Sequence, residues 1–183
     1  MRIISGKFRG HRLKAFKASH IRPTTDRVKE SVFNKLASHL DEARVLDLFA
    51  GTGNLSFEAI SRGAAEVIAV EKSPKSVQII KANQAHLKVQ TGFRVVKSDV
   101  LKFLAQYEGA PFDLIFIDPP FTEKMADKVM LEIRGSSVVG SDSIIMIEST
   151  KHETIGDEYG DLQLLDRKDF GDKKVSFFES KKE

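Results

Sequence analysis

Hydrophobic residues follow two different spacings between about residue 45 and residue 148. Short apolar runs bounded by turn residues are typical of buried strands, whereas apolar residues three and four positions apart are typical of helices. The two patterns alternate along the chain, and they predict strands at 45–49, 66–71, 93–97, 113–117 and 143–148 and helices at 54–62, 74–88, 99–107 and 123–134.

A strand followed by a helix, repeated along the chain, predicts a parallel sheet with right-handed crossovers and helices on both faces. The pattern changes after Glu148. The runs LQLLDRKDF and KKVSFFES have little helical spacing between them, and the turn residues Gly171 and Asp172 join them. These runs predict a final antiparallel pair of strands in an α/β fold.

The segment before the first predicted strand is expected to form a small appendage. Residues 2–17 alternate between apolar and polar well enough for two short strands. Thr25 or Asp26 can cap a helix that follows them. This helix is predicted to reach about Leu40, with an apolar stripe of Val28, Val32, Phe33, Leu36 and Leu40 and an opposite face that carries Arg27 and Lys35. We expect residues 1–40 to pack on a main domain formed by residues 41–183.

The stretch RVLDLFAGTGNL at residues 44–55 combines a buried strand, a glycine turn and the start of a helix. This arrangement opens the doubly wound folds that bind nucleotides at the carboxyl ends of their strands. Without a Cβ atom, Gly51 and Gly53 can adopt positive φ and let a ligand approach the backbone closely. Glu71 ends the next apolar run, where such folds use a carboxylate to bind ribose hydroxyls. We therefore expect an adenosine-type ligand at this loop.

Basic side chains are concentrated at the amino-terminal end, although the net charge of the whole chain is only +3. Residues 1–30 carry nine basic and two acidic side chains, a net charge of +7, and the rest carries 20 basic and 24 acidic ones, a net charge of −4. Such an asymmetry favours a polyanionic partner, most simply a nucleic acid, although a solvated basic arm has the same composition. The residues expected to contact RNA are Lys7, Arg9, Arg12, Arg22, Thr24 and Arg27.

Composition excludes several classes of protein. The 183 residues include no cysteine, which excludes disulfides and thiolate metal sites, and the five histidines show no spacing typical of metal ligands. No apolar run approaches the length of a membrane span, and the start MRIISGKFRG carries charges too early for a signal peptide. We therefore expect a globular cytoplasmic enzyme that binds neither a metal nor a membrane.

The stretch DLIFIDPPF at residues 113–121 places polar acceptors directly after a wholly apolar strand. Pro119 and Pro120 lack N–H donors and have a fixed φ, so the carbonyls at this turn are expected to point outward without backbone partners. The Asp118 carboxylate and the Pro119 carbonyl then form a rigid pair of acceptors, and the flat ring of Phe121 lies beside them.

Rigid acceptors beside an aromatic ring suit the exocyclic amine of a nucleobase. The lone pair of such an amine is delocalised into the base, which makes the nitrogen a poor nucleophile. Acceptors that bind both amine hydrogens favour a pyramidal nitrogen, and preorganised dipoles stabilise the positive charge that forms on it as it attacks an electrophile. Stacking on an aromatic ring fixes the geometry of attack. The candidate catalytic residues are therefore Asp118, Pro119, Pro120 and Phe121.

The glycine turn departs from the dinucleotide pattern G-x-G-x-x-G, because Ser56 stands at the third glycine position. Asp47, the two glycines and Glu71 together resemble the cofactor site of class I S-adenosylmethionine-dependent methyltransferases. The cofactor that this resemblance implies has no pyrophosphate and does not require the third glycine. The resemblance implies a Rossmann-like, seven-stranded and mostly parallel sheet in the order 3-2-1-4-5-7-6, with helices on both faces and an N-terminal β-hairpin and helix before it.

The motifs also indicate a particular family. DPPF at residues 118–121 has the form typical of amino-methyltransferases. The segments RIISGKFRGHRL, RPTTDRVKESVFN, LDLFAGTGNLSFEAISRGA, VEKS and FDLIFIDPPF occur in the order found in the bacterial RsmD family. The chain resembles this family closely to about residue 121 and more loosely beyond. One departure is Gly171-Asp172, where the family often has Gly-Gln.

The RsmD family methylates the exocyclic N2 of one guanine, conventionally guanine 966, in 16S ribosomal RNA. The resemblance implies S-adenosylmethionine as cofactor, a 16S ribosomal RNA partner within a small-subunit assembly particle, and an unpaired or flipped guanine held at Asp-Pro-Pro-Phe. The implied cofactor residues are Gly51, Gly53, Asn54 and Leu55 for the methionine part, Glu71 for the ribose, and Asp99 and Val100 for the adenine, with Asp47 and Lys72 beside them.

Three other functions are compatible with parts of this pattern. The same acceptors would serve methylation of adenine N6 in DNA or RNA, although such enzymes often have a larger target-recognition region and no long insertion occurs here. A dehydrogenase could use Gly51, Gly53 and Glu71, but it would not require Asp-Pro-Pro-Phe. A non-catalytic RNA-binding module could keep the fold, and the intact acceptors at residues 118–121 argue against it.

Overall fold

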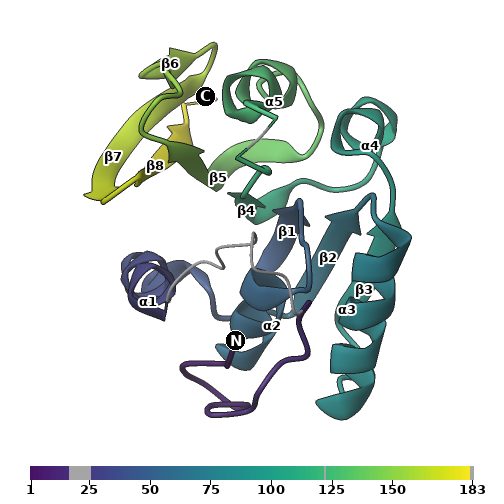
Figure 1. Ribbon diagram of the computed structural model, residues 1–183. Helices are drawn as coiled ribbons and strands as arrows, with labels where there is room; N and C mark the ends of the chain where they lie inside the picture. The colour runs from purple at the N-terminus through teal and green to yellow at the C-terminus, as the bar shows by residue number, and fades with distance from the viewer. Residues whose placement is uncertain (17–25, 122, 182–183) are drawn as a thin grey trace.

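The structure of the protein, a computed structural model, describes residues 1–16, 26–121 and 123–181. Eight strands form one sheet in this part of the chain (Figure 1). The strands are Arg44–Leu48 (β1), Glu66–Glu71 (β2), Phe93–Lys97 (β3), Phe112–Ile117 (β4), Val139–Thr150 (β5), Glu158–Tyr159 (β6), Leu162–Phe170 (β7) and Lys173–Ser180 (β8). The helices are Asp26–Lys35 (α1), Asn54–Ser61 (α2), Pro74–His86 (α3), Val100–Gln106 (α4) and Ala126–Ile133 (α5), with a 3₁₀ helix at Ala37–His39 (η1).

The strand order in the sheet is β3-β2-β1-β4-β5-β8-β7-β6. The pairs from β3 to β5 are parallel, and those from β5 to β6 are antiparallel. The predicted α/β class, parallel core and final antiparallel pair are therefore confirmed. The predicted count of seven strands is wrong, because the short strand β6 pairs with the start of β7 at the sheet edge. A strand of two residues has too short a pattern for prediction from hydrophobic spacing.

Helices cover both faces of the sheet, as predicted. On one face, α4 and α5 pack on residues of the central strands such as Leu46 and Ile115. On the other face, α1 and α2 pack in a cluster that includes Phe33 and Phe116. Ile115 and Phe116 lie in different clusters because successive residues of a strand point to opposite faces. Figure 1 shows the central strands separating α1 and α2 from α4 and α5.

The N-terminal segment does not contain the two predicted strands. The chain doubles back on itself, but the pairing is reduced to one antiparallel bridge between Arg2 and Arg12. Three backbone N–H groups between them, those of Ile4, Ser5 and Phe8, bond to side chains of α2. Ile4 and Ser5 donate to the carboxylate of Glu58, at 2.9 and 3.1 Å. Because these donors are used by α2, they cannot form a ladder between two strands.

Helix α1 has the predicted apolar stripe and is shorter than predicted. It ends at Lys35, and η1 continues the chain toward Leu40. The backbone N–H of His39 donates to the carbonyl of Leu36 at 2.9 Å, three residues back, which is the bonding pattern of a 3₁₀ helix and not of an α-helix. The buried stripe residues are Val28, Val32, Phe33, Leu36 and Leu40. On the opposite face, the ammonium of Lys35 lies 2.9 Å from the carboxylate of Asp166, so Lys35 contacts β7.

Candidate active site

Four polar positions lie along one edge of the sheet, where the parallel strands end. Glu71 ends β2, the glycine loop at residues 49–53 follows β1, Asp118 follows β4, and Glu148 lies near the end of β5. The strand register places these positions at one level, in the order β2, β1, β4 and β5. Neighbouring strands are about 4.8 Å apart, so a ligand at Glu71 can reach Asp118 across β1 alone. This is the edge at which α/β folds bind ligands.

The glycine loop has the backbone conformation that its two glycines predict. Gly51 has a φ of +56° and Gly53 a φ of +85°. A Cβ atom at Gly53 would lie 2.6 Å from the ring of Phe57, so a larger residue does not fit there. A Cβ atom at Gly51 would meet nothing closer than 3.9 Å. The loop is therefore closely packed toward α2 and open on the side of Gly51.

The carboxylate of Glu71 bonds to the glycine loop. Its Oε2 accepts the backbone N–H of Gly51 at 2.8 Å, and its Oε1 accepts that of Ser73 at 2.7 Å. A carboxylate oxygen has two lone pairs, so each oxygen retains acceptor capacity for a further donor. Glu71 can therefore shape the loop and accept bonds from two hydroxyls at the same time.

Asp47 is buried inside the protein next to the first turn of α2, with 1% of the residue exposed. The Ser56 hydroxyl donates to its carboxylate, and the Ser56 backbone N–H bonds to it as well. Burial raises the pKa of Asp47 from its ordinary 3.8 to about 7, and the bonds from Ser56 oppose this rise. The serine at the third glycine position therefore has a structural partner, and Asp47 fixes the start of α2.

Asn54 and Leu55 follow the glycine loop as the first residues of α2. The side chain of Asn54 accepts a bond from the ammonium of Lys29 at 3.0 Å, and the side chain of Leu55 is buried in the core. Both side chains thus contact protein. The first-turn N–H groups of a helix have no partner within the helix, so backbone donors are what this end of α2 can offer a ligand.

The predicted adenine residues lie at the start of α4. Asp99 caps this helix, because its carboxylate accepts the backbone N–H groups that follow it, at 3.0 and 3.3 Å. The side chain of Val100 is buried.

Lys72 follows Glu71, and its ammonium lies 3.0 Å from the carboxylate of Glu123 on the exposed surface. The bond to Glu123 raises the pKa of Lys72.

The Asp-Pro-Pro-Phe turn follows β4 directly. Pro119 is buried, Asp118 and Phe121 are half-buried, and Pro120 is exposed. The carbonyl of Pro120 accepts the backbone N–H of Glu123 at 3.0 Å. The expectation that the carbonyls at this turn lack backbone partners is therefore wrong for Pro120. A proline lacks a donor but keeps its acceptor, so its carbonyl can still close a turn.

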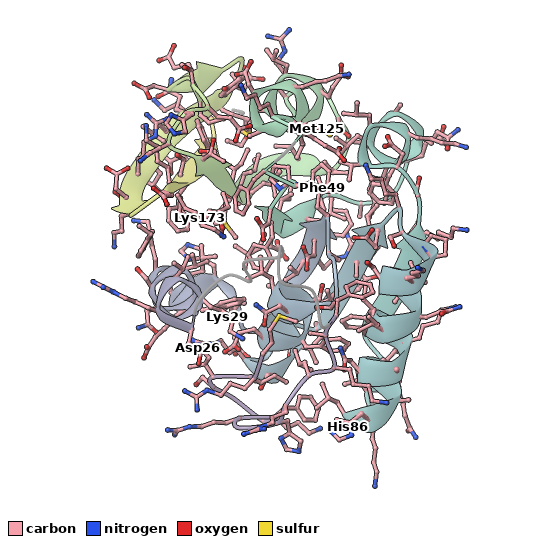
Figure 2. The ribbon with its side chains drawn as sticks, in the orientation of Figure 1. Asp26, Lys29, Phe49, His86, Met125 and Lys173 are labelled. Carbon is pink, nitrogen blue, oxygen red and sulfur yellow. The ribbon has the colours of Figure 1, made fainter. Side chains whose placement is uncertain are left out.

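A buried ion pair lies beside Phe121. The ammonium of Lys173, the first residue of β8, pairs with the carboxylate of Glu148, and the two side chains are 12% and 1% exposed. The same ammonium lies 4.4 Å from the centroid of the Phe121 ring. A cation over an aromatic face is attracted to it, so Lys173 favours one position of the ring. Figure 2 shows Lys173 and Phe49 near the ends of the central strands.

The predicted RNA-contacting residues are exposed where the structure describes them. Lys7, Arg9, Arg12 and Arg27 all lie on the surface. The predicted contacts at Arg22 and Thr24 lie outside the described residues.

Sequence reasoning missed several polar residues of this region. Lys29 is 1% exposed and Asn83 is fully buried, and both lie on apolar helical stripes, four residues before Phe33 and three after Ile80. A polar residue in a buried stripe must find a partner inside the protein, so this signal was available. Glu148 gave the same kind of signal as Glu71, since it also follows an apolar run near a strand end.

Two further properties concern the described residues only. No group of three or more His, Asp or Glu side chains among them could bind a metal ion. None of their helices is both long and apolar enough to cross a membrane.

Known proteins share this sequence over most of its length. Residues 1–179 match the family described as "Conserved hypothetical protein 95". The putative rRNA methyltransferase YlbH of Bacillus subtilis is 35% identical over 173 residues, which cover 93% of this chain and 94% of that protein. Ribosomal RNA small subunit methyltransferase D of Escherichia coli K12 is 38% identical over 149 residues, which cover 81% of this chain and 74% of that protein.

Solved structures share the fold as well. The putative methyltransferase yhhF from Escherichia coli is 33% identical and superposes with a TM-score of 0.88, covering 98% of this chain and 97% of that one. A putative methylase from Haemophilus influenzae is 30% identical, with a TM-score of 0.85 and coverages of 99% and 98%. The chain therefore belongs to the Conserved hypothetical protein 95 family, the RsmD family of methyltransferases that its motifs resemble.

Proposed function

We propose that this protein transfers a methyl group from S-adenosylmethionine to the exocyclic N2 of one guanine in 16S ribosomal RNA, the guanine 966 type of reaction. The observation that carries the proposal is the row formed by Glu71, the glycine loop and Asp118 along one sheet edge. Glu71 and Asp118 lie on either side of β1, which supports a nucleoside site and an amine site one strand apart. Relatives named as ribosomal RNA methyltransferases support ribosomal RNA as the substrate class.

The residues around the glycine loop fit S-adenosylmethionine. The open side of Gly51 admits a ligand close to the backbone, and Glu71 keeps acceptor capacity for two ribose hydroxyls. We assign the methionine part to the start of α2 and the adenine to the turn at Asp99 and Val100. When bound, the cofactor supplies an electrophilic methyl group on a sulfonium.

The Asp-Pro-Pro-Phe turn would bind the target amine. The Asp118 carboxylate and the Pro119 carbonyl accept the two amine hydrogens, and Phe121 stacks on the base while Lys173 favours one position of its ring. The bonds orient the nitrogen lone pair toward the methyl group, and the acceptors stabilise the positive charge that forms. After transfer the nitrogen is cationic and strongly acidic, so its extra proton leaves to Asp118 or to water and restores the neutral amine.

The N-terminal segment supplies the cations for an RNA partner. We assign phosphate contacts to the exposed side chains of Lys7, Arg9, Arg12 and Arg27, and on sequence grounds to Arg22 and Thr24. A net charge of +7 over residues 1–30 against −4 elsewhere would orient the RNA toward this end. On this proposal residues 1–40 are the RNA-binding appendage, residues 41–183 are the methyltransferase domain, and the partner is a small-subunit assembly particle in the cytoplasm.

Nucleoside analysis tests the proposed reaction directly. Purified protein is incubated with methyl-labelled S-adenosylmethionine and either free 16S RNA or particles that contain it, and the digested RNA is analysed by mass spectrometry. We expect N2-methylguanosine, and far less of it in the same time with the Asp118→Ala variant. Label in N6-methyladenosine would support the adenine alternative instead. Label in neither nucleoside with both RNA substrates would overturn the proposal.

A further inference from the structure

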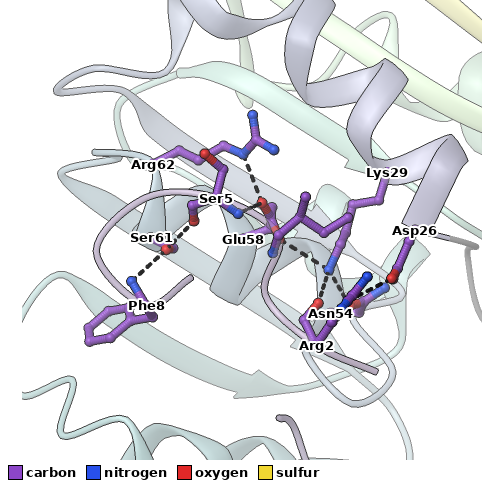
Figure 3. Close-up of polar contacts among 10 residues, drawn as sticks. Arg2, Ser5, Phe8, Asp26, Lys29, Asn54, Glu58, Ser61 and Arg62 are labelled. Atoms are coloured by element: carbon purple, nitrogen blue, oxygen red, sulfur yellow. Dashed lines mark hydrogen bonds and ion pairs between the residues drawn. The ribbon is translucent and has the colours of Figure 1, made fainter. Parts of the chain in front are cut away.

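Two buried polar side chains connect the N-terminal segment, defined here as residues 1–14, to the glycine loop and to Asn54 directly after it. The first is Lys29 of α1. Its ammonium donates to the carbonyl of Arg2 at 2.6 Å and to Oδ1 of Asn54 at 3.0 Å, and it lies 3.1 Å from Oε2 of Glu58 (Figure 3). These acceptors use all three ammonium protons. Lys29 is therefore fully occupied inside the protein and does not serve the exposed basic surface.

The second connection is Asn83 of α3, which is fully buried. Its Oδ1 accepts the backbone N–H of Lys14 at 2.7 Å, and its Nδ2 donates to the carbonyls of Lys14 at 3.0 Å and Thr52 at 3.1 Å. The amide therefore binds both backbone groups of Lys14 and, from the same nitrogen, the residue between the two glycines of the loop. One side chain thus joins the N-terminal segment to the loop backbone.

Glu58 of α2 fixes the other end of the N-terminal segment. This carboxylate is fully buried and accepts the backbone N–H groups of Ile4 and Ser5. It is compensated by two cations, Lys29 at 3.1 Å and Arg62 at 2.8 Å (Figure 3). Arg62 lies at the far end of α2 from the glycine loop and shares Glu58 with Lys29. Its side chain is 12% exposed, so it is a reference for the loss of a largely buried partner of Glu58 away from the loop.

The choice of lysine at position 29 has a cost. Burial lowers the pKa of Lys29, against the influence of Glu58, because the interior disfavours the charged ammonium. An apolar residue on the same stripe would pack without that cost. An apolar residue could not bond to Arg2, Glu58 or Asn54, and of these three contacts the bond to Asn54 is the one next to the glycine loop.

We propose that Lys29 and Asn83 are positioning residues for cofactor binding, which fix the glycine loop against the N-terminal segment through the Asn54 side chain and the Thr52 carbonyl. The inference rests on the proposed binding of S-adenosylmethionine at this loop. Ordering a loop with two glycines costs conformational entropy, and a ligand that must order it binds more weakly. The two side chains order the loop before the ligand arrives. The N-terminal segment thus serves the cofactor as well as RNA.

Three single variants test the positioning role: Lys29→Met, Asn83→Ala and the reference Arg62→Met. The dissociation constant of S-adenosylmethionine is measured by calorimetry and the melting temperature by scanning calorimetry. We expect Lys29→Met and Asn83→Ala to raise the dissociation constant about tenfold, the scale of one or two newly mobile groups at a site. Arg62→Met should lower the melting temperature by a similar amount and leave the dissociation constant within about twofold. Equal losses of affinity in all three would mean that stability alone is involved, and would overturn the proposal.

A double-mutant cycle tests whether Lys29 acts through Asn54. If it does, Lys29→Met should add less than about a twofold change to the dissociation constant of Asn54→Ala. Fully additive effects would contradict the proposal.

Amide hydrogen exchange, measured at low temperature, can be applied even to a variant of low stability. In Lys29→Met and Asn83→Ala, exchange at residues 51–54 should accelerate more than exchange at Leu46 of β1. Equal acceleration would overturn the positioning role. Wild-type protein that fails to bind S-adenosylmethionine would overturn the proposed function itself, whereas normal wild-type binding with unchanged variants would overturn only this inference.

Discussion

The carboxylates near the sheet edge differ in what surrounds them, and their surroundings give them different tasks. Glu71 accepts two backbone N–H groups and shapes the glycine loop. Asp118 is half-buried at a proline turn, where a ligand can approach it. Asp47 lies inside the protein beside Ser56. The same functional group therefore acts as a loop partner, a candidate substrate acceptor and a structural acid within three neighbouring strands.

Variants of Asp118 can distinguish a role as hydrogen-bond acceptor from a role as general base. A neutral exocyclic amine is too weak an acid to lose a proton before attack, so the proposed role of Asp118 is acceptance. A neutral acceptor retains part of that role. We expect Asp118→Asn to remain measurably active, and Asp118→Ala to lose about 10²–10³-fold in turnover, the scale of removing one preorganised polar group. Single-turnover methylation of a particle that contains 16S RNA measures both rates.

The control for this prediction is cofactor binding. Both Asp118 variants should bind S-adenosylmethionine almost as the wild type does, because Glu71 and the glycine loop are unchanged. Equal losses of turnover in the Asn and Ala variants would show that a carboxylate is obligatory.

Asp47 should make the stability of the protein depend on pH. Its pKa is about 7 in the folded state and near 3.8 in the unfolded state, so between these values the unfolded chain binds fewer protons than the folded one. The free energy of unfolding therefore falls as pH rises from about 4 to about 7, as far as Asp47 contributes to it. Asp47→Asn should remove this contribution, and urea unfolding at several pH values measures it.

A second variant should enlarge this effect. Ser56→Ala removes a bond that favours the ionised form of Asp47, so the decline in stability should extend to higher pH than in the wild type. A pH profile that is the same for the wild type and Asp47→Asn would show that Asp47 does not titrate in this range.

At the scale of elements, the backbone and the basic side chains of the N-terminal segment have different roles. Its backbone groups bond to Glu58 and Asn83, whereas the side chains of Lys7, Arg9 and Arg12 lie on the surface. Backbone bonds to buried residues fix the position of the segment, and exposed cations leave its surface available for phosphate. One short segment can therefore support the cofactor loop and contact RNA without conflict.

The triple variant Lys7→Ala, Arg9→Ala and Arg12→Ala tests the surface part alone. We expect weaker RNA binding and a salt dependence that is flatter by roughly 0.7 log units for each phosphate that the variant no longer neutralises. Filter binding at a series of salt concentrations measures the slope. The dissociation constant of S-adenosylmethionine should not change, because the backbone bonds of the segment remain. An unchanged salt slope would identify the segment as a solvated basic surface.

At the scale of the whole molecule, the sheet order brings distant segments to one edge. Glu71, the glycine loop and Asp118 belong to different crossover units, and the register between β2, β1 and β4 sets their spacing. A ligand that contacts all three segments binds only the folded protein. Its binding energy is then added to the stability of the fold.

The melting temperature should therefore identify the cofactor. At a free concentration of 100 times its dissociation constant, S-adenosylmethionine is expected to stabilise the protein by about 2.7 kcal/mol. NAD should have no effect at the same concentration, because the loop lacks the third glycine of a dinucleotide site. Scanning fluorimetry measures both. Stabilisation by NAD alone would favour the dehydrogenase alternative and contradict the cofactor assignment.

The sequence by itself determined the parallel strands, the helices between them and the residues at their ends, but not the short strand β6, the end of α1 or the pairing in the N-terminal segment. Strands and helices follow from spacings that repeat within a few positions, and the glycine turn follows from the need for positive φ at Gly53. Glu71 and Asp118 were visible because each ends an apolar strand of a parallel sheet. All of these signals lie within a few neighbouring residues, so they can be identified without knowing which distant residues are in contact.

Only the tertiary structure decided which buried polar groups meet. Asn83 bonds to Lys14 across 69 positions, and Lys29 bonds to Asn54 across 25. Lys173 contacts Phe121 through the pairing of β5 with β8. A buried polar side chain must find a partner, but packing selects which one, because the partner is whichever complementary group the fold brings within bonding distance. The contacts that fix the glycine loop and favour one position of the Phe121 ring therefore could not be predicted from spacing along the chain.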